Sequence, residues 1–240
     1  MRAYVCFDDT DTVDADRGTG KLARWFENEL PEGCSLWGVV RQQLLVHDEI
    51  PYTSHNSSAC AVIDIPGRDI LIELKTRAVQ HIEKHFISGS DPGLCVACEG
   101  DKALEHLMAF GKSCAACIMT QQQAMDAACG AHLSGHGGSN DGIIGAAAGA
   151  GLTAWGWAGR FIEFGRLRDF TSLASVAALT YAGIQVVSLD RDAKIPASDD
   201  MVDTKAWLRP RLWGAQAVLP VIFKQEGLWE GINEKRRNNT

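Results

Sequence analysis

The chain has 240 residues, with 23 Lys or Arg and 30 Asp or Glu, so its formal net charge is −7. A hydrophobic content of 46% and a charged content of 22% are ordinary for a folded protein and exclude a largely disordered chain. The acidic balance, without an extended basic run, argues against a general nucleic-acid-binding protein. The first residues lead straight into a short apolar segment, so we expect no signal peptide, a cytoplasmic protein and no membrane partner.

An acidic cluster follows the first predicted strand, which covers residues 3–7. The cluster consists of Asp8, Asp9 and Asp11, with Thr10 among them. Adjacent carboxylates repel one another unless a cation neutralises them, and hard oxygen ligands suit Mg²⁺, which is usually shared with substrate phosphates. The alternative is an acidic turn after an edge strand.

The next segments contain cationic and polar groups that suit a phosphate site. Gly18 and Lys21 open a predicted helix through Leu30, where backbone N–H groups and an ammonium can meet phosphate, although the spacing is not that of a Walker A loop. A predicted strand over 36–46 carries Arg41. The polar loop 50–58 then leads into a strand over 59–65, and it either lines a site or is simply solvated.

A helix is predicted over 69–86 from its apolar face. His81 and His85 stand one turn apart on it, as metal ligands can, but no third ligand is apparent and the pair borders a charged face. We therefore expect a solvated pair. A strand over 94–98, a helix over 101–110, and a short strand running into a helix over 113–129 follow.

Two Cys-x-x-Cys pairs lie in this region, formed by Cys95 with Cys98 and by Cys114 with Cys117. Their spacing formally matches a zinc template. No Gly or Pro shapes either pair into a knuckle, and the residues between the pairs form a helical pattern. We expect packed, reduced thiols and no zinc on them.

A glycine-rich stretch precedes a run of small residues. Its candidate site residues are His136, Gly137, Gly138, Asp141, Gly142 and Gly145. A glycine-rich loop before a helix N-terminus is an anion-binding arrangement, and the alternative is a flexible hairpin or linker. The uncharged run 142–159 is close to membrane length, but its Ala and Gly content favours a closely packed helix of a soluble protein.

The rest of the chain continues the alternation of strands and helices. We predict a strand over 161–164, a helix over 172–181, a strand over 184–189, a loop over 195–203 and a last strand over 215–223. The predicted class is α/β or α+β, with mixed sheets and packed helices.

Three stretches, in order, resemble the archaeal tRNA(Ile) agmatinylcytidine (agmatidine) synthetase family. They are Phe7 to Asp11 followed by Arg17-Gly18, then 50–53 with Asn56 and Ala59, and then 141–148. Arg41 and the segment Ser90-Asp91-Pro92-Gly93 are supporting matches. The resemblance covers roughly residues 1–190.

The resemblance implies a kinase-like catalytic domain over 1–165 and a smaller ferredoxin-like portion over 166–240. It also implies that ATP and Mg²⁺ are bound and that a cytosine carbonyl oxygen is phosphorylated so that agmatine can displace it. The family's catalytic aspartates fall on Asp8, Asp9 and Asp11, and Thr53 and Asn56 fall near the nucleotide. We expect no counterpart of the family's tRNA-holding domains, and Thr19-Gly20-Lys21 stands where the family has a Thr pair, so tRNA is not expected as a partner of this chain alone.

The leading hypothesis is an ATP- and Mg²⁺-dependent phosphotransferase or ligase that activates a carbonyl or similar oxygen on a small-molecule or nucleobase acceptor. Arg41 or Lys21 would neutralise phosphate, and His136 or His55 would serve as base. One alternative is a haloacid-dehalogenase-like phosphatase with Asp9 as nucleophile. Another is a non-catalytic nucleotide-binding module or a partial tRNA-modification subunit.

Overall fold

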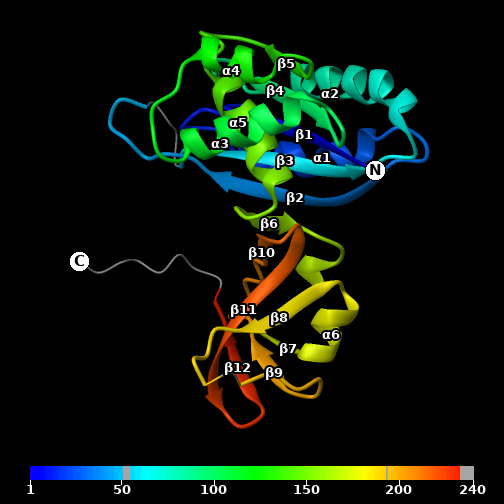
Figure 1. Ribbon diagram of the computed structural model, residues 1–240, viewed down its shortest axis with the longest axis vertical. Coiled ribbons are helices and arrows are strands. Elements are labelled where there is room, and N and C mark those ends of the chain that lie inside the picture. The colour runs from blue at the N-terminus through cyan, green and yellow to red at the C-terminus, as the bar shows by residue number, and fades with distance from the viewer. Residues whose placement is uncertain (51–54, 193, 233–240) are drawn as a thin grey trace.

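The computed structural model describes residues 1–50, 55–192 and 194–232. Its strands are β1 (Arg2–Asp8), β2 (Ser35–Gln43), β3 (Ser57–Asp64), β4 (Gly93–Cys98), β5 (His132–Gly135), β6 (Arg160–Glu163), β7 (Leu173–Ser175), β8 (Ile184–Ser188), β9 (Met201–Asp203), β10 (Arg211–Trp213), β11 (Gln216–Gln225) and β12 (Leu228–Gly231). Its helices are α1 (Thr19–Trp25), α2 (Leu71–His85), α3 (Ala103–Cys114), α4 (Gln121–Ala127), α5 (Gly142–Trp155) and α6 (Val176–Tyr181), with 3-10 turns η1 (Phe26–Glu29), η2 (Arg68–Ile70) and η3 (Leu167–Asp169). Helices pack on a large mixed sheet, which confirms the predicted class (Figure 1).

The sheet follows the order β5-β4-β1-β3-β2-β6-β10-β11-β12-β9-β7, with β8 paired to β11. β1 is antiparallel to both of its neighbours, β3 and β4. Its side chains alternate between two cores, as the period of a strand requires. Tyr4 and Cys6 enter the core that contains α3 and α5, whereas Val5 and Phe7 enter the core beneath α1 and α2.

Helix α5 packs unusually closely because its small residues admit neighbouring backbone and side chains. A Cβ on Gly151 would lie 1.9 Å from the carbonyl oxygen of Leu107 in α3, and one on Gly149 would lie 2.1 Å from Ser58 Oγ in β3. Most of the helix is buried, so the prediction of a packed helix here is confirmed. Among the described residues, no helix is long and apolar enough to cross a membrane.

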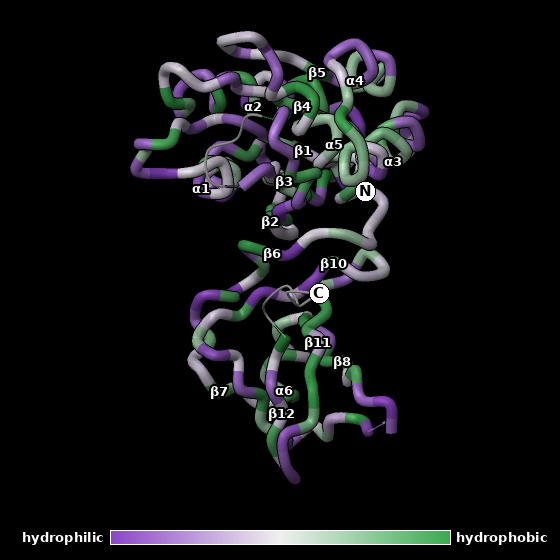
Figure 2. Tube along the Cα trace, turned by 90° about the vertical axis from the view of Figure 1, so that its left-hand side faces the viewer, coloured by the Kyte–Doolittle hydropathy of each residue, from purple (hydrophilic) through white to green (hydrophobic). Residues whose placement is uncertain are grey.

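The part of the molecule after β6 is built around β11. This long strand is antiparallel to β10 and β12 and parallel to β8. Helix α6 packs beside β8. Figure 2 shows the hydrophobic stretches of β4 and β11 within their parts of the molecule. The sheet runs on without a break from β6 to β10, so the predicted division at residue 165 stays a prediction.

Several predicted elements differ from those of the structure. The short strand predicted at the start of 113–129 does not form, because α3 continues to Cys114 and Thr120 then caps α4. Part of the predicted glycine-rich loop forms β5 at the sheet edge, paired with β4. The predicted helix over 172–181 begins with β7, the predicted loop over 195–203 contains β9, and β12 follows the strand predicted to be last.

The cysteines of the two Cys-x-x-Cys pairs do not meet. Cys95 and Cys98 are three residues apart on β4, so they point to opposite faces of the sheet. Cys95 and Cys114 lie in the α3–α5 core, Cys98 lies in the other core, and Cys117 is exposed. These positions do not allow the four thiols to share one zinc ion.

Candidate active site

Five aspartates line a cleft of about 270 Å³ at the end of β1, which we call the acidic cleft. They are Asp8, Asp9, Asp11, Asp91 and Asp141, and the carboxylate of Glu49 also lines the cleft. Asp8 ends β1, and the chain turns at once because Asp9 adopts a left-handed conformation with φ of 47°. Asp91 comes from the loop before β4, and Asp141 is the N-cap residue of α5; both elements lie next to β1.

Two aspartates of the acidic cleft, Asp8 and Asp9, hold protons more tightly than free carboxyls do. Loss of hydration, followed by the charges of Asp9 and Asp11, raises the pKa of Asp8 to about 8. Loss of hydration, followed by the charge of Asp91, raises the pKa of Asp9 to about 6. Such a cleft lowers its electrostatic free energy by taking up protons or a cation, so it is suited to bind a divalent metal.

Two predicted glycines line the acidic cleft, and both sit where a side chain would collide. A Cβ on Gly145 would lie 1.7 Å from Asp8 Oδ2, and one on Gly142 would lie 2.0 Å from the carbonyl oxygen of Asp91. The backbone N–H of Gly142 also donates to that carbonyl oxygen at 3.1 Å. The start of α5 can therefore approach the acidic loops only because it lacks side chains there.

Asp11 anchors the start of α1. Its Oδ1 accepts hydrogen bonds from the backbone N–H of Thr19 at 2.9 Å and from Thr19 Oγ1 at 3.0 Å. The buried Thr10 hydroxyl lies 3.1 Å from the same Thr19 oxygen. Asp11 is thus fixed in orientation by two donors, and it stands between the acidic cleft and a second, larger cleft.

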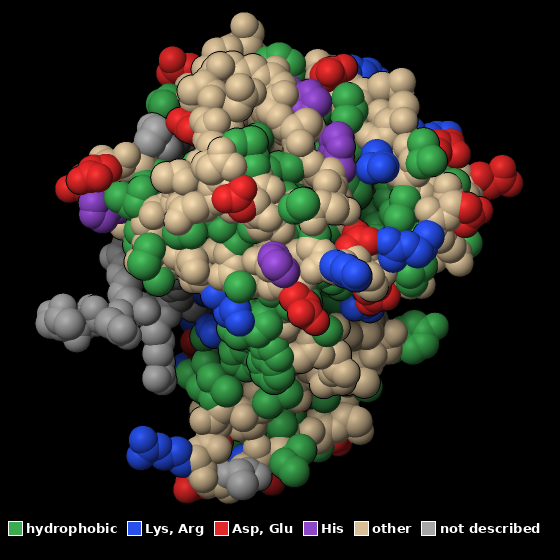
Figure 3. Space-filling view, turned by 45° about the horizontal axis from the view of Figure 1, so that its top comes forward, with side chains coloured by type: hydrophobic (Ala, Val, Ile, Leu, Met, Phe, Trp, Pro, Cys, Tyr) green, Lys and Arg blue, Asp and Glu red, His purple; other side chains and the backbone are tan. Residues whose placement is uncertain are grey.

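The second cleft, of about 510 Å³, is lined by many cationic side chains, and we call it the basic cleft. These cations are Lys21, Arg24, Arg41, Arg160, Arg168 and Arg209. On the face shown in Figure 3, by contrast, Lys and Arg are interspersed with Asp and Glu. In a chain with a net charge of −7, such a local concentration of cations is suited to bind an anion.

The arginines of the basic cleft are crowded. Burial, followed by the charges of Arg168 and Arg24, lowers the pKa of Arg209 to about 10. Glu163 partly offsets this repulsion, with its Oε2 at 3.1 Å from Arg168 Nε and 3.7 Å from Arg24 Nη1. Arg41 is also desolvated, which lowers its pKa, and its Nε donates to Ser57 Oγ at 2.9 Å. An anion entering the cleft would relieve this crowding.

The two clefts adjoin. Both are lined by Asp11, Thr19, His55 and Ser57. The predicted residues Gly18, Lys21 and Arg41 line the basic cleft, and Asn56 lines the acidic cleft while its Nδ2 donates to the carbonyl oxygen of Leu45 at 2.6 Å. Thr53 lies outside the described residues.

The other predicted glycines, Gly137 and Gly138, pack against the segment that carries Asp91. Gly137 packs against Pro92, and a Cβ on Gly138 would collide with the carboxylate of Asp91. That carboxylate accepts hydrogen bonds from the backbone N–H and the hydroxyl of Ser139. The ring of His136 is directed to Ser134 Oγ at 2.8 Å and to Glu83 of α2 at 3.4 Å, which does not support its predicted role as a base.

Several site residues were not predicted from the sequence. Asp91 had a signal, since the segment Ser90-Asp91-Pro92-Gly93 precedes a strand. The arginines at 24, 160, 168 and 209 had none, because they are scattered along the chain and are brought together only where α1, β6, η3 and the segment before β10 meet.

No model of a known protein family matches the chain, and no curated protein matches its sequence. Solved structures do match. A tRNA fluorescent labelling enzyme matches with a TM-score of 0.53 and 23% identity. Agmatidine synthetase in complex with an isoleucine tRNA and ATP matches with a TM-score of 0.53 and 22% identity, and its complex with that tRNA, AMPCPP and agmatine with 0.51 and 23%.

Each of these three matches covers 63% of this chain and 36% of the solved chain, so the chain spans about a third of the length of the proteins that it matches. At this identity the likeness shows the fold alone. Over 63% of its length, the chain has the fold of part of the tRNA-modifying agmatidine synthetase.

Proposed function

We propose that the chain is an ATP- and Mg²⁺-dependent phosphotransferase or ligase, related to agmatidine synthetase, that activates a carbonyl or similar oxygen of its acceptor. The observation that carries this proposal is the junction of the acidic and basic clefts at Asp11, Thr19, His55 and Ser57. Phosphoryl transfer depends on positioning and on charge neutralisation, with metal-binding oxygens next to cations. The shared fold supports it, because the matched structures include complexes with ATP and with AMPCPP and agmatine.

The acidic cleft fits Mg²⁺ when that ion is shared with phosphate. Within the described part of the chain its charged groups are carboxylates, and loss of hydration raises the pKa values of Asp8 and Asp9, so a cation there would offset an electrostatic cost. Among the described residues, no three of its carboxylates bring oxygens within 4.8 Å of one another. Mg²⁺ usually binds one or two carboxylates together with substrate phosphates. Asp8 and Asp9 would hold it, and it would neutralise the phosphate charge.

The chain's own residues would place the nucleotide across the junction. Arg41 and Lys21 would contact phosphate oxygens from the basic cleft, while Asp11 holds Thr19 and the start of α1 in place. The acceptor oxygen would approach from the acidic cleft, past Asn56. A guanidinium such as that of Arg41, held by Ser57, is well suited to bind phosphate.

The dehalogenase-like alternative does not fit the fold. β1 has antiparallel neighbours on both sides, so the acidic cluster does not lie at the carboxyl edge of a parallel sheet, where open α/β sheets bind ligands. None of the matched structures named above is a phosphatase. A test of the proposed function is ATP turnover, with and without Mg²⁺, in the presence of agmatine and candidate acceptor nucleobases. ATP binding without turnover for any acceptor would identify a nucleotide-binding module.

The affinity for Mg²⁺ is expected to rise with pH. Protons compete with the metal for the carboxylates, and the pKa is raised to about 6 for Asp9 and to about 8 for Asp8. The dissociation constant for Mg²⁺, measured by calorimetry with ATP present, should fall steadily between about pH 5.5 and pH 8.5. An affinity that is constant over this range would contradict the assignment of these two aspartates as ligands.

Replacing Arg41 by Met should weaken ATP binding about tenfold or more, because a charge-assisted hydrogen bond to phosphate contributes about 1.5–3 kcal/mol. Met keeps most of the apolar stem, so the fold should be retained. Arg166→Met is the matched control, since the Arg166 side chain is 88% exposed. Equal ATP affinities for the two variants would show that Arg41 does not contact the nucleotide.

A further inference from the structure

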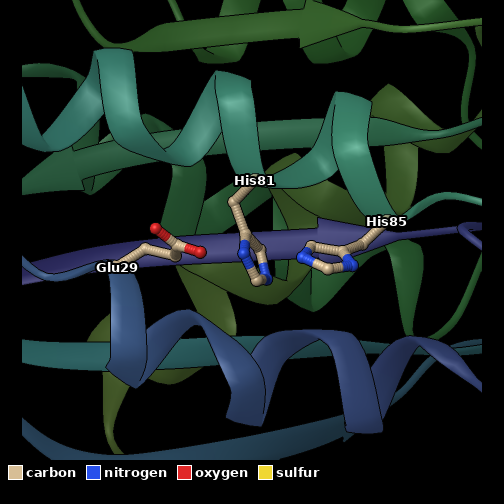
Figure 4. A group of neighbouring side chains, drawn as sticks. All are labelled: Glu29, His81 and His85. Atoms are coloured by element: carbon tan, nitrogen blue, oxygen red, sulfur yellow. The ribbon is translucent and has the colours of Figure 1, made fainter.

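We propose that Glu29, His81 and His85 form a binding site for a divalent transition metal, with Zn²⁺ as the preferred ion. Glu29 ends η1, and the two histidines lie in the last turns of α2. Figure 4 shows the two imidazoles side by side over β1, with the Glu29 carboxylate on the other side of His81. The site is separate from both clefts, and it does not depend on the proposed function.

His81 is prepared to act as a ligand. The residue is only 2% exposed, and its Nε2 lies 2.9 Å from the carbonyl oxygen of Leu22. A carbonyl can only accept, so Nε2 carries the proton and Nδ1 presents a lone pair. That Nδ1 atom is buried and has no hydrogen-bond partner. A ring that donates one N–H to a backbone carbonyl and offers the other nitrogen is the usual arrangement of a metal-bound histidine.

The other two ligands are close and adjustable. One ligand atom from each of the three residues lies within 4.8 Å of the others. Bonds of about 2.0–2.2 Å in a tetrahedral zinc site place ligand atoms about 3.3 Å apart, so the atoms need to approach by at most about 1.5 Å. Glu29 and His85 are half-buried, and histidines at i and i+4 share one helix face. Rotation of these two side chains is enough to close the site.

The charge and the chemistry of the ligands suit a transition metal. Lys84 lies 3.6 Å from Glu29 and offsets its charge, but its side chain is 66% exposed and can turn into solvent. A set of two imidazoles and one carboxylate suits Zn²⁺ better than Mg²⁺ or Ca²⁺, which prefer oxygen ligands.

This arrangement corrects the prediction of a solvated histidine pair. His81 is buried, and the third ligand comes from η1, which the sequence pattern of α2 alone does not reveal. A metal here would tie η1 to α2. It would also brace the segment before α1, because Arg17 Nη2 donates to the carbonyl oxygen of His85 at 3.2 Å.

The test is a titration of the full chain, stripped with a chelator, with Zn²⁺ by calorimetry and with Co²⁺ by visible absorption. Cys117 and Cys129 are exposed thiols that could bind the added metal, so both are replaced by Ser in every protein of this test. We expect one equivalent of metal. His85→Ala and Glu29→Gln should each weaken binding at least about tenfold, and His106→Ala, at an exposed histidine of α3, should not. Zn²⁺ should raise the melting temperature of the parent chain but not of His85→Ala.

Binding of equal affinity in the parent chain, His85→Ala and Glu29→Gln would overturn the assignment, as would the absence of binding in the parent chain. Loss in His85→Ala without loss in Glu29→Gln would remove Glu29 from the site and overturn the three-residue proposal. Glu29→Gln is isosteric at a half-buried position, so its result can be interpreted even if His85→Ala lowers the stability of the fold.

Discussion

Replacing Asp8 by Asn is expected to abolish Mg²⁺-dependent ATP turnover and, at the same time, to make the ligand-free protein more stable at pH 8. The pKa of Asp8 is raised from 3.8 to about 8 in the fold. A carboxyl with a raised pKa costs stability once the pH exceeds its unfolded value, and the cost grows until the pH reaches the folded value. The wild-type protein should therefore lose stability between about pH 4 and pH 8, and the amide removes that loss.

The two effects are measured separately. After allowance for the partial exposure of Asp8, the gain in free energy of unfolding at pH 8 should be about 1–3 kcal/mol by denaturant titration. Turnover should fall at least about a thousandfold. Asp14→Asn is the matched control, because Asp14 is exposed and close in sequence, and it should change neither quantity. Full turnover by Asp8→Asn would remove Asp8 from the active site.

Two Gly→Ala substitutions in α5 are expected to have opposite consequences. At Gly145 the new Cβ would meet the end of the Asp8 side chain at 1.7 Å, and that carboxylate can rotate away. Because Ala is favoured over Gly inside a helix by about 0.5–1 kcal/mol, stability should be kept. Turnover should fall about a hundredfold, since the displaced carboxylate no longer has the geometry that the reaction requires.

At Gly151 the new Cβ would meet the backbone carbonyl oxygen of Leu107 at 1.9 Å, which cannot move without separating α3 from α5. We expect Gly151→Ala to lower the free energy of unfolding by about 2 kcal/mol or more, as overpacking does. The molecules of Gly151→Ala that remain folded should have the same turnover per folded molecule, and the same metal dependence, as the wild-type protein. If Gly145→Ala lost stability as severely as Gly151→Ala, the interpretation of Gly145 as a residue that makes room for Asp8 would fail.

The elements that the sequence predicts well are those with a strong local pattern. β1 follows from a short continuous apolar run, α2 from the periodicity of its apolar face, and α5 from its run of small residues. The short strands β7 and β9 have three residues each and pair only with strands that are distant in the sequence, so no local pattern specifies them.

The acidic half of the candidate site was predictable for the same reason. Asp8, Asp9 and Asp11 are close together in the sequence, and Gly142 and Gly145 stand at a recognisable helix start. The basic half is an outcome of the fold, since Arg24 and Arg209 lie far apart in the chain and line one cleft. His81 shows the same limit, because its burial and its third partner depend on the packing of η1 against α2.

The most direct test of the central claim is a calorimetric titration of the wild-type chain with ATP, once with Mg²⁺ and once with EDTA, repeated with Asp8→Asn. If the junction of the two clefts is a nucleotide site, the wild-type chain should bind one ATP with an affinity that Mg²⁺ increases at least about tenfold, and Asp8→Asn should lose that increase. ATP binding that is absent in the wild-type chain, or that responds neither to Mg²⁺ nor to Asp8→Asn, would contradict the account.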